Sequence, residues 1–111
     1  MSAIPSPEGI DKLIHERARL GIMSSLAAAG PMTFSELKET LGMTDGNLSV
    51  HARVLEEAGY IRIEKQFVGR KPQTTMSLTA KGSKAFTDYV AYLESIVAPK
   101  GRLKDDQRGP L

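Results

Sequence analysis

The sequence contains no cysteine, few aromatic residues and no long apolar run. The absence of cysteine excludes disulfide bonds, thiolate metal sites and a cysteine nucleophile. The two histidines, His15 and His51, have no third ligand at a suitable spacing, so we expect no metal ion and no cofactor. Aromatic residues make up only 5% of the chain and all hydrophobic residues 41%, so aliphatic side chains and methionine must fill the core.

Signals for a membrane protein or an enzyme are also absent. No apolar run approaches the length of a membrane span, and the N-terminal residues MSAIPSPEG lack the charged and apolar regions of a signal peptide. We therefore expect a cytoplasmic protein with no membrane contact. Glycine-rich phosphate loops, catalytic serine motifs and HExxH are missing, and the adjacent acidic pairs Glu56–Glu57 and Asp105–Asp106 are interpreted as solvated surface. No enzymatic activity is expected.

The net charge of +2 hides an uneven distribution. Residues 1–59 carry 5 Lys and Arg against 8 Asp and Glu, whereas residues 60–111 carry 10 against 5. Within residues 60–84 the count is 6 against 1. A local basic patch favours a polyanionic partner through Coulomb attraction and counterion release. By itself, this charge fits a solvated basic surface without a partner equally well.

The length of 111 residues fits one domain, which we place at residues 8–97 between a flexible leader, residues 1–7, and a disordered tail, residues 98–111. A first helix is expected from about Glu8 to Ala29, where Gly30-Pro31 ends it. Its apolar residues form two stripes, which suggests two packing partners. One stripe comprises Ile10, Ile14, Ala18, Ile22 and Leu26, and the other comprises Leu13, Leu20, Met23 and Ala27.

Two further helices are predicted from their capping residues. Thr33 and Glu36 have the spacing of a capping box, and Gly42 suits a left-handed C-cap. Thr44 then caps a third helix, which we expect to end at Gly59. The buried face of this third helix is expected to comprise Leu48, Ala52, Leu55 and Ala58.

A hairpin and a long helix are expected to follow. Alternation of apolar and polar residues predicts two strands, around residues 61–64 and 75–78, and Gly69 and Pro72 interrupt the run between them. The last helix should span Ala80–Val97, with Thr79 as its cap. Its apolar residues, spaced three and four apart, form a seam that we predict to mediate dimerisation together with Leu13 and Leu20. The seam comprises Phe86, Tyr89, Val90, Leu93, Ile96 and Val97. Alternatively, the last helix folds back on the first helix of its own chain.

The segments FSELKETLGMTDGNLSVHARVLEEAGYI and GRKPQTTMSLTAKG resemble the helix-turn-helix and the wing of winged helix-turn-helix regulators of bacteria and archaea, close to the MarR-like and ArsR-like groups. The resemblance covers about residues 10–97. It implies an α-α-α-β-β-α fold, mainly α with a small β-hairpin wing, and a homodimeric transcriptional regulator. The first and last helices would form the dimer interface, the second helix of the motif would enter the major groove, and each wing would touch the adjacent backbone.

The chain also departs from these relatives. ArsR-like metal sensors carry a cysteine-containing motif in the helix before the recognition helix, where this chain has SELKETL without cysteine or histidine. Many relatives have a basic residue where this chain has Val50. The chain is shorter than a typical MarR-like protein, so a large pocket for a small-molecule effector is not expected, although such an effector stays possible.

Candidate DNA contacts follow from the residue chemistry. On the third helix they are Asn47, which can bond adenine edges; Ser49, which can serve bases or phosphates; Val50, which can contact a thymine methyl; and Arg53, which can bind guanine or phosphate. On the wing they are Arg70 and Lys71 for phosphates or the minor groove, with Gln73 and Thr74 adding neutral hydrogen bonds. For Arg62, Lys65, Lys81 and Lys84, contact and solvation are equally plausible. His51 is interpreted first as structural, with DNA contact second and metal ligation third.

The sequence therefore predicts a winged-helix homodimer that binds double-stranded DNA at a palindromic operator and regulates transcription, as a repressor. Thr33 and Ser35 could bind a phosphate at a helix N-terminus, and for Thr33 we prefer the capping role. The alternative function is a winged-helix protein–protein interaction module without specific DNA binding, because a fold does not fix a function.

Overall fold

The computed structural model describes residues 10–97 of the chain. The elements are, in order, α1 (Arg17–Ala29), β1 (Met32–Thr33), α2 (Phe34–Leu41), α3 (Asp45–Glu57), β2 (Ile61–Val68), β3 (Lys71–Leu78) and α4 (Ala80–Val97). The expected winged helix-turn-helix architecture is confirmed. The predicted leader, residues 1–7, and the predicted tail, residues 98–111, lie outside the described residues.

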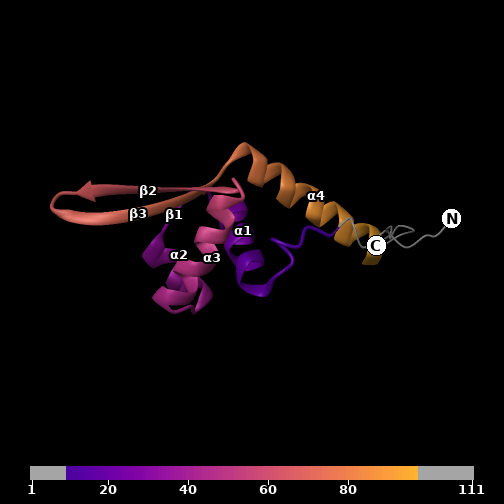
Figure 1. Cartoon of the computed structure of the whole chain (residues 1–111), viewed down its shortest axis with the longest axis horizontal. Coiled ribbons are helices and arrows are strands. Elements are labelled where there is room, and N and C mark those ends of the chain that lie inside the picture. The colour runs from indigo at the N-terminus through magenta and orange to yellow at the C-terminus, as the bar shows by residue number, and fades with distance from the viewer. Residues whose placement is uncertain (1–9, 98–111) are drawn as a thin grey trace, which may run out of the picture.

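The first three helices form a bundle, and the hairpin and α4 extend from it in opposite directions (Figure 1). The strands form one antiparallel sheet in the order β1-β3-β2. The sequence did not predict β1, whose Met32 and Thr33 pair with Met76 and Thr75. A strand of two residues is too short to show the alternation by which strands are recognised in a sequence.

The helix α1 begins at Arg17, so the predicted start at about Glu8 is wrong. The side chain of Asp11 accepts hydrogen bonds from the backbone N–H groups two and three residues later, at 2.9 and 3.2 Å. Glu16 is the N-cap, and its side chain accepts a hydrogen bond of 2.8 Å from the backbone N–H of Arg19. That hydrogen bond is the main reason why the pKa of Glu16 lies below its ordinary value. The capture of backbone N–H groups by Asp11 competes with helix formation over residues 11–14, which explains the later start, whereas Glu16 caps the helix that follows.

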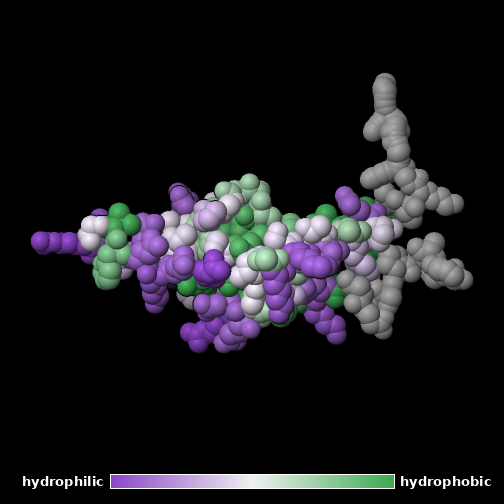
Figure 2. All heavy atoms as spheres, turned by 90° about the horizontal axis from the view of Figure 1, so that it is seen from above, coloured by the Kyte–Doolittle hydropathy of each residue, from purple (hydrophilic) through white to green (hydrophobic). Residues whose placement is uncertain are grey.

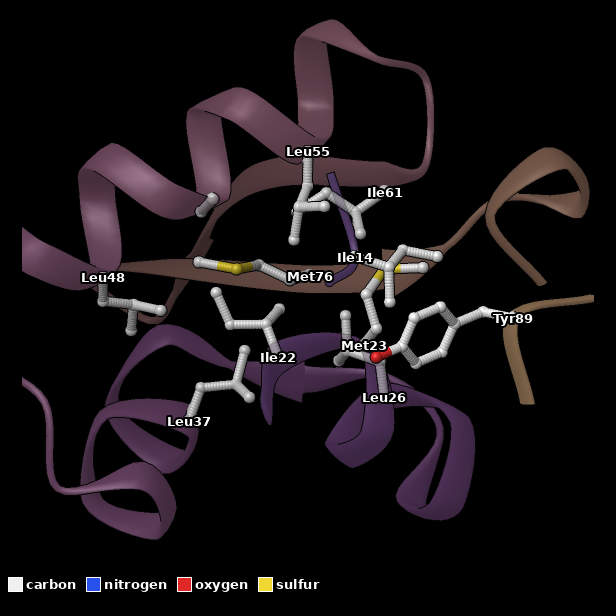
Figure 3. Packing of buried hydrophobic residues seen from close by; sticks show 11 residues of the cluster. Ile14, Ile22, Met23, Leu26, Leu37, Leu48, Leu55, Ile61, Met76 and Tyr89 are labelled. Atoms are coloured by element: carbon white, nitrogen blue, oxygen red, sulfur yellow. The ribbon is translucent and has the colours of Figure 1, made fainter. Parts of the chain in front are cut away.

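One hydrophobic core connects all four helices to the sheet (Figure 3). Its buried members are Ile14, Ile22, Met23, Leu26, Leu37, Leu48, Ala52, Leu55, Ile61, Met76 and Tyr89. Met23, which the sequence assigned to a second stripe of the first helix, lies in the same core as Ile22 and Leu26. Because α3 and both long strands contribute to this core, packing fixes the position of α3 relative to the hairpin.

The caps of the helix-turn-helix are confirmed. Thr33 Oγ1 accepts a hydrogen bond from the backbone N–H of Glu36 at 3.1 Å, and the Glu36 side chain accepts one from the backbone N–H of Thr33 at 2.9 Å. Gly42 ends α2 in the left-handed conformation, with a φ of 64°. Thr44 caps α3 through a bond of 3.1 Å from the backbone N–H of Asn47. These local contacts define both ends of the turn between α2 and α3.

The hairpin is longer than the sequence predicted. Val68 pairs with Lys71, so the connection is a two-residue turn of Gly69, with a φ of 66°, and Arg70. The prediction that Pro72 interrupts the strand is wrong, since Pro72 lies within β3 opposite Phe67. Proline is tolerated there because β1 pairs only with residues 75 and 76, so one edge of β3 has no strand beside Pro72.

The start of α4 is bonded to the turn that follows α3. Thr79 donates its backbone N–H to the carbonyl oxygen of Tyr60 at 3.0 Å and its hydroxyl to that of Gly59 at 2.6 Å. A Cβ atom on Gly82 would lie 1.9 Å from the Tyr60 carbonyl oxygen, which is closer than any real contact. Only glycine therefore permits this approach, and the Leu-Thr-x-Lys-Gly segment of the wing motif has a structural role.

Candidate nucleic-acid interface

The helix α3 presents one face to solvent because its other face is buried. The buried face comprises Leu48, Ala52 and Leu55. The four residues predicted to contact DNA, Asn47, Ser49, Val50 and Arg53, are all exposed. Val50 exposes 61% of its surface, which leaves its methyl groups accessible to a thymine methyl in the major groove. The exposed face thus combines neutral hydrogen-bonding groups, an apolar side chain and one cation.

A polar cluster holds α3 against the start of α1. Arg19 donates from Nη1 to Nδ1 of His51 at 3.1 Å and from Nε to the carbonyl oxygen of Leu13 at 2.7 Å. A carboxylate oxygen of Glu16 lies 3.7 Å from the same Nδ1. A guanidinium group can only donate, so Nδ1 is an acceptor and the ring of His51 carries its proton on Nε2. The interpretation of His51 as a structural histidine at a helix junction is confirmed.

A lysine of α2 pairs with the acidic residue in the first turn of α3. Lys38 Nζ lies 2.8 Å from a carboxylate oxygen of Asp45, which occupies the first position of α3. A carboxylate at a helix N-terminus is stabilised by the helix dipole. Lys38 and Arg53 are the only cations in residues 33–59, so this pairing makes Arg53 the principal cation available on the exposed face of α3.

A groove lies between α3 and the hairpin, and we call it the α3–wing groove. It has a volume of about 490 Å³ and is lined by Phe34, Ser49, Ala52, Arg53, Glu56, Ile63, Lys65, Thr74 and Met76. The structure therefore brings two predicted residues of α3, Ser49 and Arg53, together with Thr74 and Lys65 of the hairpin. Lys65 and Arg62 lie on opposite faces of β2 because side chains alternate along a strand.

The remaining wing residues lie nearer the tip. Arg70 and Lys71 are exposed, whereas Gln73 is half-buried. A second hollow, of about 440 Å³, separates this part of β3 from the N-terminus of α2, and Lys71, Gln73 and Ser35 are among its lining residues. The backbone N–H groups at the start of a helix favour an anion. This second hollow adjoins the α3–wing groove and places polar side chains and the cation Lys71 beside it.

The sequence of the described domain matches a known family. Residues 18–97 match the family of winged helix DNA-binding domains. The chain belongs to this family. The uncharacterized protein MJ0432 of Methanocaldococcus jannaschii is 34% identical over 79 residues, which cover 71% of this chain and 86% of that protein.

Solved structures of winged-helix regulators share this fold. A transcriptional regulator homologue from Pyrococcus horikoshii OT3 has a TM-score of 0.74 at 29% identity, covering 78% of this chain and 86% of that chain. A MarR-like transcriptional regulator from Thermotoga maritima has a TM-score of 0.60 at 25% identity, covering 86% of this chain and 65% of that chain. The structural neighbours of this winged-helix protein are thus MarR-like transcriptional regulators.

The sequence left DNA contact and solvation equally plausible for four further cations of this winged-helix chain, Arg62, Lys65, Lys81 and Lys84. Two of them, Lys81 and Lys84, contact other residues of the chain. Lys81 donates to the carbonyl oxygen of Ala58 at 2.8 Å, where it satisfies the C-terminal end of α3. Lys84 pairs with Asp88 at 2.8 Å, one helical turn along α4. Lys81 therefore has a role in the fold, whereas the pair of Lys84 and Asp88 is exposed and adds little to stability, and Lys65, which lines the α3–wing groove, is the better candidate for DNA contact.

The predicted dimerisation seam divides into buried and exposed parts. Tyr89 exposes only 2% of its surface, and its hydroxyl lies 2.8 Å from Nδ1 of His15 in the same chain. Tyr89 therefore belongs to the core of its own chain, which corrects its assignment to a surface between two chains. Leu20, Phe86 and Leu93 pack partly against the core, Leu13 and Val90 are half-buried, and Ile96 and Val97 expose 43% and 78% of their surfaces. The distal end of α4 is thus the exposed part of the seam.

Residues 10–97 contain neither a membrane-spanning helix nor a metal-binding cluster. No helix there is long and apolar enough to cross a membrane. No group of three or more histidine, aspartate or glutamate side chains within the same residues could hold a metal ion.

The apolar side chain of Phe67 near the wing tip is a feature that the sequence analysis missed, although an apolar residue beside Gly69-Arg70-Lys71 was visible in the sequence.

Proposed function

We propose that this protein is a homodimeric transcriptional repressor that binds double-stranded DNA at a palindromic operator. The observation that carries the proposal is the α3–wing groove, where Ser49 and Arg53 of the helix-turn-helix face Lys65 of the hairpin. A helix with an exposed polar face beside a basic hairpin is a known arrangement for reading a major groove and holding the adjacent backbone. A protein that binds DNA in bacteria or archaea acts in the cytoplasm, and the proposal includes no catalytic reaction.

The two elements have different tasks in this proposal. The exposed face of α3, with Asn47, Ser49, Val50 and Arg53, reads base edges in the major groove. The wing, with Arg70 and Lys71 near its tip and Gln73 and Thr74 behind them, contributes phosphate contacts and most of the electrostatic affinity. This division follows from the charges, because the hairpin, residues 61–78, carries 4 cations against 1 acidic residue, whereas the exposed face of α3 carries Arg53 as its one cation.

Dimerisation accounts for the exposed end of α4. Ile96 and Val97 form an apolar surface there, and Phe86, Val90 and Leu93 continue it toward the core. Two copies related by a two-fold axis would place two α3 helices about 34 Å apart, one turn of DNA, and would require a palindromic operator. Occupation of such an operator excludes other proteins from it, which is the basis for proposing repression.

Selection of bound sites from random duplex DNA, followed by binding of single variants, tests the DNA-binding proposal. Arg53→Ala should lower affinity for the selected site and relax the preference at one base pair by about 1–3 kcal/mol. Arg62→Ala is the matched control, because Arg62 is exposed on the opposite face of the hairpin from Lys65. Equal base preferences in Arg53→Ala and the wild type would contradict the proposed reading by α3.

Light scattering tests the dimer. The double change Ile96→Glu and Val97→Glu adds charge to side chains that are already exposed in one chain, so it should separate the dimer into folded monomers. Val68→Glu introduces the same charge at an exposed valine on the wing and should leave the dimer intact. A dimer that persists in the α4 variant would contradict the proposed interface.

A further inference from the structure

The end of the hairpin carries two large exposed apolar side chains that the core does not use, and side-chain alternation places them on opposite faces of β2. Phe67 exposes 75% of its surface and Val68 exposes 57%. Figure 2 shows hydrophobic atoms gathered at the end of the hairpin, beside strongly hydrophilic side chains. Large apolar side chains on an exposed strand end favour contact with another molecule, because water contact with them is unfavourable and they add nothing to the core.

The register of the hairpin shows which way Phe67 faces. Side chains alternate along a strand, so Ile63, Lys65 and Phe67 lie on one face of β2. Ile63 and Lys65 line the α3–wing groove, which means that this face is turned toward α3. Pro72 is the partner of Phe67 across the hairpin and lies on the same face. Phe67 and Pro72 therefore continue the α3–wing groove outward as an apolar surface.

The length of the hairpin matches the spacing of DNA grooves. From Ile63 at the core to Phe67 is four residues, or roughly 13 Å, and to Val68, the last residue of β2, is five residues, or roughly 17 Å, at about 3.3 Å per residue, with the turn of Gly69 and Arg70 just beyond. A major groove and the adjacent minor groove lie about half a helical turn apart, roughly 17 Å. With α3 in the major groove, the segment from Phe67 to Arg70 reaches the neighbouring minor groove.

The charges around Phe67 fit that location. Arg70 is exposed at the turn, three residues from Phe67, and Lys65 lies behind Phe67 on the same face, whereas Lys71 pairs with Val68 on the opposite face. The nearest acidic residue along β2 is Glu64, which points to the opposite face. An aromatic ring bordered by cations suits a surface with phosphates at its edges and apolar sugars within it, which is the surface of a minor groove.

We propose that Phe67, supported by Pro72 and flanked by Arg70, is an apolar wedge that enters the minor groove beside the α3 site and partly opens a base step. This inference rests on the proposed function and adds a source of specificity to it. Apolar wedges unstack base pairs and bend the duplex, and pyrimidine–purine steps yield most easily. Each operator half-site should therefore favour a TA or CA/TG step about half a turn from the bases that α3 reads, although no side chain bonds to that step.

The test uses a duplex selected with the full-length wild-type protein. Bending is measured by energy transfer between end labels, and unstacking by the fluorescence of 2-aminopurine placed at the predicted step. We expect the wild type to bend the duplex and raise this fluorescence, and Phe67→Ala to abolish both and weaken binding about tenfold. Phe67→Leu should keep most of the effect. The salt dependence of binding should be unchanged in both variants, because neither removes a charge.

The controls separate this inference from the proposed function. Arg70→Ala should reduce the salt dependence of binding, and Arg53→Ala should relax a base preference. In both of these variants, bending of the duplex should still depend on Phe67. If Phe67→Ala bends the duplex as the wild type does while Arg53→Ala still loses base preference, the wedge is wrong and the proposed function stands. A loss of self-association in Phe67→Ala with unaltered DNA binding would also overturn the wedge, in favour of contact between copies. Absence of duplex binding by the wild type would overturn both.

Discussion

Substitution of Gly82 by alanine tests the closest backbone contact in the fold. The added Cβ would lie 1.9 Å from the carbonyl oxygen of Tyr60, 2.7 Å from its carbonyl carbon and 2.9 Å from its Cα. All three are backbone atoms, so no side chain can rotate away to make room. The start of α4 must instead move away from the turn that follows α3.

The energetic effect follows from the hydrogen bonds at that junction. Three bonds cross it: Thr79 N–H to the Tyr60 carbonyl at 3.0 Å, the Thr79 hydroxyl to the Gly59 carbonyl at 2.6 Å, and Lys81 to the Ala58 carbonyl at 2.8 Å. Loss of all three, at about 0.5–1.5 kcal/mol each, destabilises the fold by roughly 3 kcal/mol. The better helix propensity of alanine returns about 1 kcal/mol. We expect a net loss of about 2 kcal/mol in the free energy of unfolding.

Urea unfolding followed by circular dichroism measures this loss, at one protein concentration because the proposed dimerisation would make stability depend on concentration. Gly46→Ala is the matched control, since Gly46 also lies in the first turn of a helix and a Cβ there would meet nothing within 4 Å beyond its chain neighbours and its own helix backbone. That control should be neutral or slightly stabilising. A Gly82→Ala protein as stable as Gly46→Ala would refute the assignment of a close backbone contact.

Two further predictions concern polar contacts. The hydroxyl of Tyr60 donates to Asp11 at 2.5 Å, and burial together with this carboxylate raises the pKa of Tyr60 to about 12 from 10.0. The folded state thus favours the protonated hydroxyl, so the stability that this hydroxyl contributes is complete below pH 10 and is lost as the pH rises toward 12. In urea unfolding at pH 10 to 12, Tyr60→Phe should therefore lose less stability than the wild type. Equal losses in the two proteins would count against the contact. Thr33→Ala removes one half of the capping box and should lower the free energy of unfolding by about 1 kcal/mol. Ser35→Ala, at an exposed position of the same helix turn, should change it little. Similar free energies of unfolding for the two variants would show that the cap contributes nothing.

The local signals in the sequence were sufficient for the helix-turn-helix. The capping box of Thr33 and the left-handed Gly42 depend on residues within one turn of each other, so their spacing predicted the bounds of α2 correctly. The start of α1 depends instead on Asp11, whose carboxylate binds nearby N–H groups and also Tyr60, 49 residues away. No pattern of neighbouring residues reveals such a partner, and the apolar periodicity alone extended the helix too far.

At the candidate site, too, the sequence predicted the features that depend on neighbouring residues and not those that depend on contacts between distant residues. Burial of Leu48 and Leu55 fixed the exposed face of α3, so periodicity identified Asn47, Ser49 and Arg53 as surface residues. Periodicity could not distinguish a side chain in its own core from one at an interface, which explains the misplacement of Tyr89 on the dimerisation seam. The α3–wing groove depends on how the hairpin packs against α3, which only the three-dimensional structure shows.

The salt dependence of binding to a selected duplex is the most direct test of the central claim, that α3 and the wing together bind double-stranded DNA. We predict that the logarithm of the binding constant falls linearly with the logarithm of the salt concentration, and that Arg70→Ala makes the slope less steep by about one phosphate contact. Arg62→Ala, on the opposite face of the hairpin from Lys65, should change the slope less. A binding constant that does not vary with salt, or no binding to duplex DNA at low salt, would contradict the account and favour a protein partner.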